Sequence, residues 1–378
     1  MSRSIPFNRF SGTGAEFQYV RRAIESMHIS GDGQFTRSCQ ALLEELLGVP
    51  KVLLTTSCTH ALEMAALLLD LREGDEVILP SFTFVSTANA FVLRGCVPVF
   101  VDIRPDTLNL DERLVEAKIT GRTKAIVPVH YGGVGCAMDP LFDIAERHGI
   151  EIVEDNAHGL FGSYRGKALG TFGSLATLSF HETKNISCGE GGALLINDPK
   201  YIERAEVLRE KGTDRSRFFR GEIDKYSWVD VGSSYLPSDI LAAFLYAQLE
   251  SREQIQDRRR TIWNTYALGL CDWARREGTR LPCIPSDRES AWHLFHLITP
   301  SQEYRRSLIE HLRSRDIHAV FHYLPLHTSG MGQRFGGREG DCAVCEDVSD
   351  RLLRLPFYNA LSDDDQHRVI DAVCEFHG

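Results

Sequence analysis

The first two-thirds of the chain alternates short apolar runs with longer stretches in which apolar residues recur every three or four positions. The short runs are rich in Val and Ile and are bounded by Gly, Pro or Asp, which is typical of buried β-strands. They cover residues 51–54, 76–80, 97–103, 125–129, 151–154, 175–180 and 193–196. Helical spacing marks 59–70, 85–94 and 138–148. This alternation predicts an α/β fold, with a mostly parallel seven-stranded sheet and helices on both of its faces.

The alternation breaks in two places. Residues 159–173 are rich in Gly and form too short a connection for a packed helix that crosses the sheet. The connection before the last strand ends in Gly189-Glu190-Gly191-Gly192. We therefore expect the last three strands to be joined by loops or hairpins, and loops at strand ends are where functional sites are commonly built.

A different pattern begins near Ser238. A long helical stretch runs from about Ser238 to Ala274, followed by possible strands at 292–299 and 318–323 and helices at 301–315 and 362–376. We expect a large domain over residues 1–250 and a smaller C-terminal α+β domain over residues 251–378.

The charge of the chain narrows its possible partners. Its 52 Asp and Glu residues outnumber its 42 Lys and Arg residues, so its formal net charge is -10. Nucleic-acid binding depends on clustered Lys and Arg, and we expect no nucleic-acid partner. No run approaches the roughly 20 apolar residues that span a bilayer, and Met1 to Phe7 lacks the apolar region of a signal peptide. We expect a cytoplasmic protein without membrane association.

The ten cysteines are spread along the chain. A disulfide framework is not expected in a long cytosolic chain of this kind. Cys342 and Cys345 form a lone CxxC motif without a second pair or a neighbouring His. We therefore expect no metal site.

Two charged residues follow neighbouring predicted strands. Asp155 directly follows the run 151–154, and Lys184 follows the run 175–180. Pyridoxal phosphate requires a lysine that forms a Schiff base with its aldehyde and an acid that pairs with its protonated ring nitrogen. The lysine must lose its proton to attack, so its surroundings must lower its pKa. Taken singly, Lys184 is more simply interpreted as a surface lysine and Asp155 as a helix cap.

A turn rich in hydroxyl groups follows the first predicted strand and opens the next helix. Hydroxyls and free backbone N–H groups at a helix N-terminus bind anions, so Ser57, Cys58 and Thr59 are candidates to hold the cofactor phosphate. An ordinary N-cap explains the same residues equally well. Ser179, one residue before the end of its run, can supply another hydroxyl.

Four ordered motifs resemble those of a known family. They are Pro80-Ser81-Phe82-Thr83-Phe84-Val85-Ser86-Thr87-Ala88-Asn89-Ala90, Glu154-Asp155-Asn156-Ala157-His158, Ser179-Phe180-His181-Glu182-Thr183-Lys184 and Gly189-Glu190-Gly191-Gly192. Over nearly its whole length the chain resembles the DegT/DnrJ/EryC1 family of sugar-nucleotide aminotransferases, which have fold type I of the pyridoxal phosphate enzymes. It is most similar to the branch that includes dTDP-4-amino-4,6-dideoxygalactose transaminase, through motifs such as Val320-Phe321-His322-Tyr323.

The resemblance implies a role for each candidate residue. Lys184 would form the Schiff base and move the proton, and Asp155 would bind the pyridine nitrogen. Phe84 would stack on the ring unless it is an ordinary core aromatic. His158 stands where the family often has Gln, beside the 3′ oxygen, and its tautomer decides whether it can donate there. The phosphate would be held by Ser57, Cys58, Thr59 and Ser179.

The resemblance also implies a homodimer with a shared site. Many members read Gly-x-Asn-Tyr-Arg where this chain has Gly232-Ser233-Ser234-Tyr235-Leu236, and their Asn reaches the partner's cofactor phosphate. Ser234 is shorter and is expected to make this contact less directly. Tyr323 and His327, in a segment that resembles the family's substrate-side loop, are candidate nucleotide-sugar contacts; a buried Tyr and a structural His are equally compatible with the sequence. We interpret the remaining histidines as packing or hydrogen-bonding residues: His130, His181, His293 and His296.

The sequence thus predicts an aminotransferase that uses glutamate, or glutamine, to aminate a dTDP-4-keto-6-deoxyhexose at C4. One alternative is amination at C3 of a related nucleotide keto-sugar. Another is a sugar 3-dehydratase, but such members replace the lysine with histidine, whereas this chain has Lys184. A third is a regulator that binds the cofactor without catalysis. Such proteins usually carry an added DNA-binding segment, for which we expect no spare length here.

Overall fold

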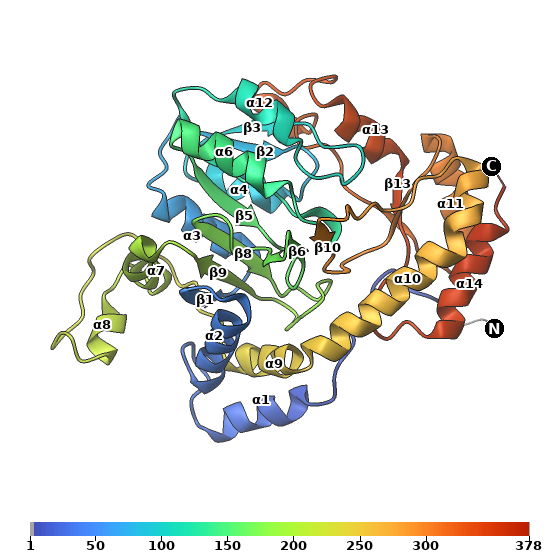
Figure 1. Ribbon diagram of the computed structural model, residues 1–378. Helices are drawn as coiled ribbons and strands as arrows, with labels where there is room; N and C mark the ends of the chain where they lie inside the picture. The colour runs from blue at the N-terminus through green and yellow to red at the C-terminus, as the bar shows by residue number, and fades with distance from the viewer. Residues whose placement is uncertain (1–3, 378) are drawn as a thin grey trace.

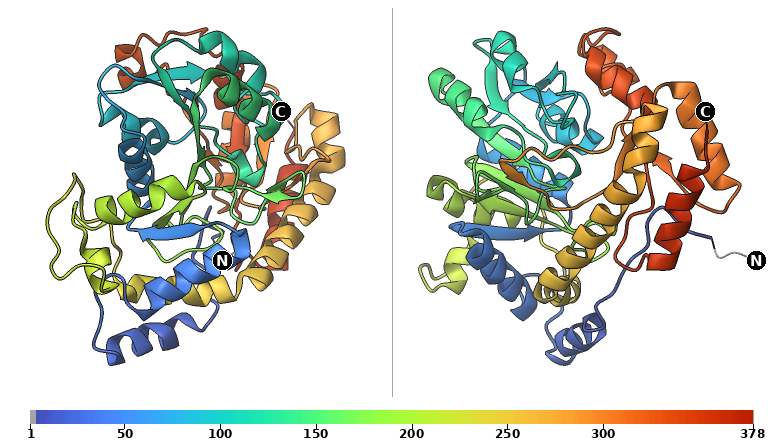
Figure 2. Two further views of the ribbon diagram at one scale, coloured as in Figure 1. Left: turned by 60° about the vertical axis from the view of Figure 1, so that its left-hand side comes forward. Right: turned by 45° about the vertical axis from the view of Figure 1, so that its right-hand side comes forward.

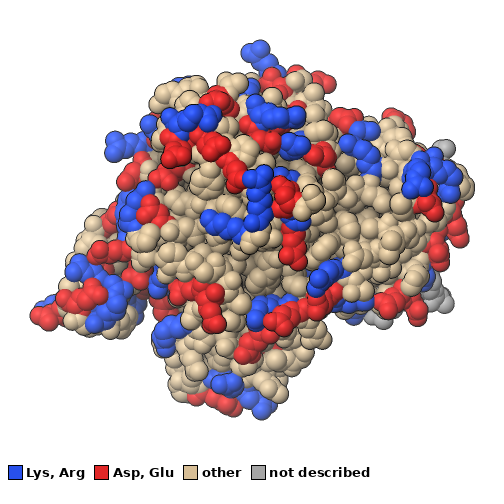
Figure 3. All heavy atoms as spheres, in the orientation of Figure 1, with Lys and Arg blue, Asp and Glu red and all other residues tan. Residues whose placement is uncertain are grey.

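The computed structural model describes residues 4–377. Met1, Ser2, Arg3 and Gly378 lie outside the described residues, and so does the first part of the segment assessed above for a signal peptide. Within residues 4–377, no helix is both long enough and apolar enough to cross a membrane. On the face shown in Figure 3, basic and acidic side chains are interspersed rather than gathered by sign.

A seven-stranded sheet forms the centre of the larger part of the molecule (Figure 1). Its strand order is β1-β9-β8-β5-β4-β2-β3, and β9 alone among these strands runs antiparallel to its neighbours. The strands are β1 (Lys51–Thr55), β2 (Glu76–Pro80), β3 (Val97–Val101), β4 (Thr123–Ile126), β5 (Glu151–Asp155), β8 (Leu175–Ser179) and β9 (Gly192–Ile196). The predicted mostly parallel sheet is confirmed.

Helices cover both faces of this sheet, which explains why its strands are continuously apolar rather than alternating. Leu53 and Leu194 point into a core with α3 (Cys58–Leu68), α4 (Val85–Val92) and α7 (Ile202–Arg209). Leu54 and Leu195 point the opposite way, toward α2 (Gln34–Leu47) and α9 (Asp239–Glu250). On that second face, α6 (Met138–His148) packs over β4 and β5. Successive residues of one strand thus serve two cores.

The connections between the last three strands are a loop and a hairpin, as predicted. The loop after β5 contains β6 (Ser163–Tyr164) and β7 (Lys167–Ala168), and β6 also pairs with β10 (Arg288–Glu289). The buried Glu154 carboxylate fixes this loop, because it accepts hydrogen bonds from the backbone N–H groups of Gly170, Phe172 and Gly173 at 2.7–2.9 Å. β8 and β9 then form a hairpin in which Ser179 pairs with Gly192.

The smaller part of the molecule is built on a second, three-stranded sheet of order β11-β13-β12. Its strands are β11 (His296–Ile298), β12 (Val320–Phe321) and β13 (Leu352–Arg354), and its helices are α10 (Arg252–Glu277), α11 (Gln302–Arg313), α13 (Ala343–Arg351) and α14 (Asp363–Cys374). The single long helix predicted from Ser238 to Ala274 is wrong in one respect, since it is two helices, α9 and α10, that meet at Ser251. Strand β13 was not predicted.

The remaining elements are short or peripheral. They are α1 (Glu16–Glu25), α5 (Glu112–Val115), α8 (Arg215–Phe219), α12 (Gly330–Arg334) and the 3₁₀ turns η1 (Glu116–Lys118), η2 (Tyr131–Gly133) and η3 (Pro199–Tyr201). In Figure 1, α8 projects away from the rest of the molecule on a long loop.

The division into domains after residue 250 stays a prediction. The α9–α10 junction lies beside that position, and Figure 2 shows α10 extending along the smaller part of the molecule. The amino-terminal segment does not follow the predicted division, because Ile5 forms a β-bridge with Ile317 and is buried in the core of the smaller part. A single division of the sequence therefore does not separate the residues of the two cores.

Candidate active site

A cavity of about 800 Å³ lies between the carboxyl ends of the central strands and the edge of the smaller sheet. Nine of the predicted site residues line it. They are Ser57, Cys58, Thr59, Phe84, Asp155, His158, Ser179, Lys184 and Tyr323. The structure thus brings together in one place residues that the chain separates by more than two hundred positions.

Lys184 and Asp155 enter this cavity from neighbouring strands. β5 ends at Asp155 and pairs in parallel with β8, whose following turn carries Lys184. Burial lowers the pKa of Lys184 from its ordinary value to about 8, although the nearby Asp155 carboxylate acts in the opposite direction. A larger fraction of this amine is therefore neutral, and able to attack a carbonyl, than of an exposed lysine at the same pH.

Two hydrogen bonds fix the Asp155 carboxyl group. Thr87 in α4 donates its hydroxyl to Oδ2 at 2.7 Å, and the backbone N–H of Ala157 donates to Oδ1 at 3.2 Å. Thr83 in turn donates to the Thr87 hydroxyl at 2.8 Å, because the Thr87 proton is already committed to Asp155. The carboxyl group is thus held by donors only, which suits it to accept a proton-bearing ring nitrogen.

The amino end of α3 forms the second feature of the cavity. Ser57 is the N-cap and accepts a hydrogen bond from the His60 backbone N–H at 3.1 Å. The first-turn amides of Cys58 and Thr59 have no carbonyl one turn earlier to bond, so they are available to an anion. The antiparallel strand β9 passes close by, and a Cβ atom at Gly192 would lie only 2.3 Å from the Ser57 carbonyl carbon. The glycine is therefore required for this approach.

His158 is neutral, and its tautomer follows from its contacts. Burial lowers its pKa well below the ordinary value, and the positive charges of Lys184 and Arg354 act in the same direction. The backbone N–H of Gly132 donates to Nδ1 at 3.4 Å, so the ring proton resides on Nε2. A histidine in this form can donate a hydrogen bond from Nε2, as the amide of Gln can.

A series of contacts connects His158 to the turn that carries Lys184. Its ring stacks on that of His293 with centroids 4.1 Å apart. His293 Nδ1 lies 2.9 Å from Oδ1 of Asn185, the residue after Lys184. The Asn185 amide nitrogen donates to the Ala291 carbonyl oxygen, so its oxygen is the acceptor in this pair and His293 donates from Nδ1.

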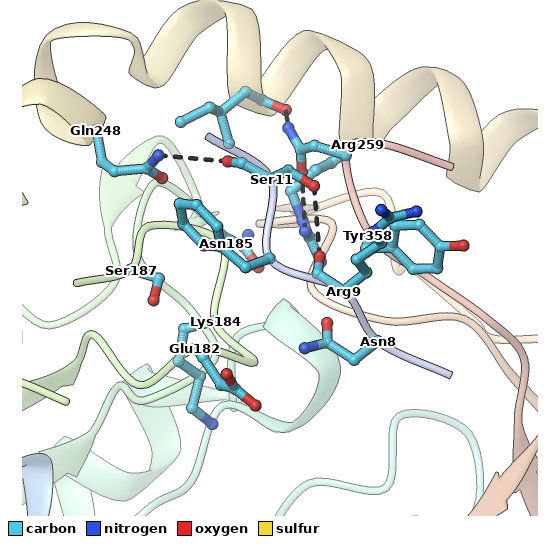
Figure 4. A pocket seen from close by; sticks show the side chains of 13 residues that line it. Asn8, Arg9, Ser11, Glu182, Lys184, Asn185, Ser187, Gln248, Arg259 and Tyr358 are labelled. Carbon is cyan, nitrogen blue, oxygen red and sulfur yellow. Dashed lines mark hydrogen bonds between the residues drawn. The ribbon is translucent and has the colours of Figure 1, made fainter. Parts of the chain in front are cut away.

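A buried arginine lies behind the lysine turn. Arg259 donates to the carbonyl oxygens of Trp292 and His293 and to the Asn359 side chain, at 2.5–3.0 Å. It lines a small separate pocket together with Lys184 and Asn185, and in Figure 4 the Lys184 amine points away from it. Arg259 therefore supports the backbone around His293 rather than facing the large cavity.

Two predicted site residues do not line the cavity. His327 is fully buried, with Nδ1 2.6 Å from Ser81 Oγ and Nε2 2.8 Å from Glu346 Oε1. Both ring nitrogens are thus occupied by protein, and its proposed substrate contact stays an untested prediction that this geometry does not favour. Ser234 is exposed on the surface of this chain, where it forms a β-bridge with Glu210.

The cavity also contains residues to which the sequence reasoning gave no role. Thr87 lies within a motif that was recognised, and its spacing of one helical turn from Thr83 was an available signal. His181 and His293 were interpreted as packing or hydrogen-bonding residues, and both line the cavity. Arg354 also lines it, and its only sequence signal was a charge within the apolar run 352–357. Among residues 4–377, no group of three or more His, Cys, Asp or Glu could hold a metal ion.

A buried lysine of lowered pKa, an acid held opposite it and a helix N-terminus suited to a phosphate fit the requirements of pyridoxal phosphate. These features define the class of protein as a pyridoxal phosphate-dependent enzyme. Comparison with known proteins makes the family explicit. The model of the DegT/DnrJ/EryC1/StrS aminotransferase family matches residues 11–374.

Individual relatives are similar over almost their full length. The spore coat polysaccharide biosynthesis protein SpsC of Bacillus subtilis is 33% identical over 366 residues, which cover 95% of this chain and 93% of SpsC. The crystal structure of S. venezuelae DesV has a TM-score of 0.90 and 32% identity, with 100% of both chains covered. The putative sugar aminotransferase Spr1654 of Streptococcus pneumoniae, in its PMP form, has a TM-score of 0.91 and 27% identity, with 98% of this chain and 97% of that chain covered.

The chain belongs to the DegT/DnrJ/EryC1/StrS aminotransferase family. It is a pyridoxal phosphate-dependent sugar aminotransferase with the fold type I architecture of these enzymes, as the sequence predicted. Solved structures of Spr1654 in PLP and PMP forms accord with the predicted cofactor.

Proposed function

We propose that this enzyme converts a dTDP-4-keto-6-deoxyhexose to the corresponding dTDP-4-amino-4,6-dideoxyhexose, with glutamate as the amino donor and 2-oxoglutarate as the second product. The observation that carries the proposal is that Lys184 and Asp155 line one cavity, which they enter from neighbouring strands. The choice of a nucleotide sugar is supported by the sugar-related names of relatives, including SpsC and Spr1654. We keep the cytoplasm as the expected compartment.

Each candidate residue has a definite task in this proposal. Pyridoxal phosphate, when bound, would supply an aldehyde that condenses with the donor's amino group and a ring that accepts electrons from the reacting carbon. Lys184 would hold the resting cofactor through its amine, and when that amine is free it would move the proton to and from the donor's α-carbon. Asp155 would keep the ring nitrogen protonated, and His158 would donate from Nε2 to the ring oxygen.

The other cavity residues bind and orient. Ser57, Cys58, Thr59 and Ser179 hold the phosphate through hydroxyls and first-turn amides. Burial raises the pKa of the Cys58 thiol to about 12, so this side chain stays neutral beside the anion. Phe84, which lines the cavity, would cover one face of the ring. Tyr323, which packs against Phe82 and Phe84 with ring centroids 5.7 and 6.3 Å apart, contacts the sugar.

The active unit in this proposal is a homodimer. Ser234 is exposed on this chain rather than in its own cavity, and it follows the projecting segment that carries α8. Exposed aromatic residues on that segment, such as Phe219 and Trp228, are 69% and 80% exposed and are suited to burial against a second subunit. Ser234 then reaches the partner's phosphate.

The test is to mix the purified enzyme with glutamate and dTDP-4-keto-6-deoxyglucose and to identify the product by mass spectrometry and NMR. We expect an amino sugar with nitrogen at C4 and stoichiometric 2-oxoglutarate. The Lys184→Ala variant should form neither. Nitrogen at C3 would support the alternative regiochemistry. No amino sugar from any nucleotide keto-sugar, with a folded and cofactor-loaded enzyme, would refute the proposal.

A further inference from the structure

Arg354 is a cation in the cavity, and no acidic residue within 4–377 forms a salt bridge with it. It ends β13, the central strand of the smaller sheet, where it pairs with Val320 on one side and His296 on the other. Its guanidinium donates to the Phe321 carbonyl oxygen from Nη2 at 3.3 Å and lies 4.5 Å from the centre of the Phe7 ring. Its Nε is buried and has no hydrogen-bond partner.

Three other arginines show what is missing at Arg354: Arg209 and Arg259 are buried, and Arg351, like Arg354, is half-buried. Arg209 and Arg351 also have an unpartnered Nε, but each forms a salt bridge with a carboxylate, Asp32 and Asp347 respectively. Arg259 has no carboxylate, but three oxygen acceptors receive hydrogen bonds from its guanidinium. Among the described residues, no carboxylate forms a salt bridge with Arg354, and it alone of these four lines the large cavity.

The groups around Arg354 do not compensate its charge. Its electrostatic neighbours are the amine of Lys184, the rings of His158, His293, His296 and His322, and the phenols of Tyr131 and Tyr323. Burial lowers the pKa of all four histidines, so they are neutral near pH 7. Arg354 itself is half-buried, with its Nε atom fully buried. A cation withdrawn from water in this way is costly without a counter-charge, which a ligand can supply. The ligand that fits is therefore an anion.

We propose that Arg354 is the subsite that binds an oxyanion of a substrate, through the two-pronged hydrogen bonding that a guanidinium offers to carboxylate or phosphate oxygens. The inference rests on the proposed function for its two candidate ligands. One is the carboxylate of the amino-acid donor, which is attached directly to the reacting carbon. The other is the diphosphate of the nucleotide-linked sugar, which is attached at C1 of the sugar. Both present the same chemistry to the guanidinium.

The test measures binding rather than turnover. Glutarate, which has the donor's carboxylates but no amino group, and dTDP are titrated by calorimetry into the cofactor-loaded enzyme. The variants are Arg354→Gln, which removes the positive charge, and Arg354→Lys, which keeps the charge but cannot form two parallel hydrogen bonds. Arg113→Gln is the matched control, because Arg113 is an exposed arginine that is paired with Asp111 and lies outside the cavity. Thermal melting and the cofactor absorbance check that each variant is folded and loaded.

We expect Arg354→Gln to weaken the binding of at least one probe by about 10- to 100-fold, with a smaller loss for Arg354→Lys and none for Arg113→Gln. A loss confined to glutarate assigns the carboxylate, and a loss confined to dTDP assigns the diphosphate. If Arg354→Gln does not fold, the affinity of Arg354→Lys for the two probes decides: weaker binding supports the inference, and unchanged binding overturns it. Unchanged binding of both probes, or no binding of either probe by the unaltered enzyme, would overturn the inference. Because neither probe is turned over, failure of the transamination assay is a separate result.

Discussion

The Thr87 hydroxyl oxygen lies 2.7 Å from Asp155 Oδ2 and donates its proton to that carboxylate. The bond joins the first turn of α4 to the end of β5, so the helix after one strand orients the acid at the end of another. Thr87 is 1% exposed and Asp155 is 5% exposed, and water therefore cannot replace the bond if it is removed.

We predict that Thr87→Val weakens cofactor binding. Valine keeps the shape of threonine but leaves Asp155 without its side-chain donor, and a hydrogen bond to a charged group contributes about 1.5–3 kcal/mol. The dissociation constant of pyridoxal phosphate, from absorbance titration of the cofactor-free protein, should rise by about tenfold or more. Thr83→Val is the control, because it leaves the Thr87–Asp155 bond in place. Equal effects of the two substitutions would contradict this role.

Substitutions at His158 test the assigned tautomer. Because Nε2 carries the ring proton, His158→Gln should preserve a donor at this place and keep kcat within about threefold. His158→Leu removes the donor and should lower kcat/KM by about 10- to 100-fold, the equivalent of 1.5–3 kcal/mol. The rates of both variants are measured in the half-reaction with glutamate. A glutamine variant as impaired as the leucine variant would argue against donation from this position.

The lowered pKa of Lys184 predicts how cofactor capture depends on pH. Only the neutral amine attacks the aldehyde, so the rate at which the cofactor-free protein binds pyridoxal phosphate should rise with pH and reach half its maximum near pH 8. A lysine with the ordinary pKa of 10.5 would reach half its maximum rate only at a much higher pH. Because the folded pKa lies below the unfolded one, the free energy of unfolding should also rise with pH between about 8 and 10.5. Stopped-flow absorbance from pH 6.5 to 10 measures the midpoint, and a midpoint above pH 10 would contradict the burial of this amine.

The central sheet and the lysine–acid pair were predictable from the sequence because they depend on local order. Buried strands are continuous apolar runs, and the residues that follow parallel strands must meet at one edge of the sheet. This reasoning places Asp155 and Lys184 without any knowledge of long-range contacts. The loop and hairpin connections between the last three strands were also predictable, since these Gly-rich segments are too short for a packed helix.

The smaller sheet and its contribution to the site were not predictable in this way. β13 has three residues, too few for a periodic signal, and the break between α9 and α10 at Ser251 involves neither Pro nor Gly. Arg354 and His293 reach the cavity only because the smaller sheet packs against the strand ends of the larger one. His327 became a candidate substrate contact through the resemblance of its segment to the family's substrate-side loop, and the sequence could not decide this role because a buried structural histidine and a ligand-binding histidine have the same sequence signature.

A stability measurement separates these two interpretations of His327. Its ring joins Ser81, which follows β2, to Glu346 in α13. His327→Ala should leave both partners without their bond and lower the free energy of unfolding by about 2–4 kcal/mol, measured by urea denaturation. KM for the nucleotide sugar should change by less than about threefold. A large rise in KM with unchanged stability would instead support direct substrate contact.

The attachment of the cofactor to Lys184 is the central claim, and chemical reduction tests it most directly. Treating the cofactor-loaded enzyme with sodium borohydride fixes any lysine–cofactor Schiff base, and peptide mass spectrometry then locates the modified residue. We predict a phosphopyridoxyl group on the peptide that contains Lys184, and its absence from the Lys184→Ala variant. Modification of a different lysine, or none in an enzyme that still transfers amino groups, would contradict the account.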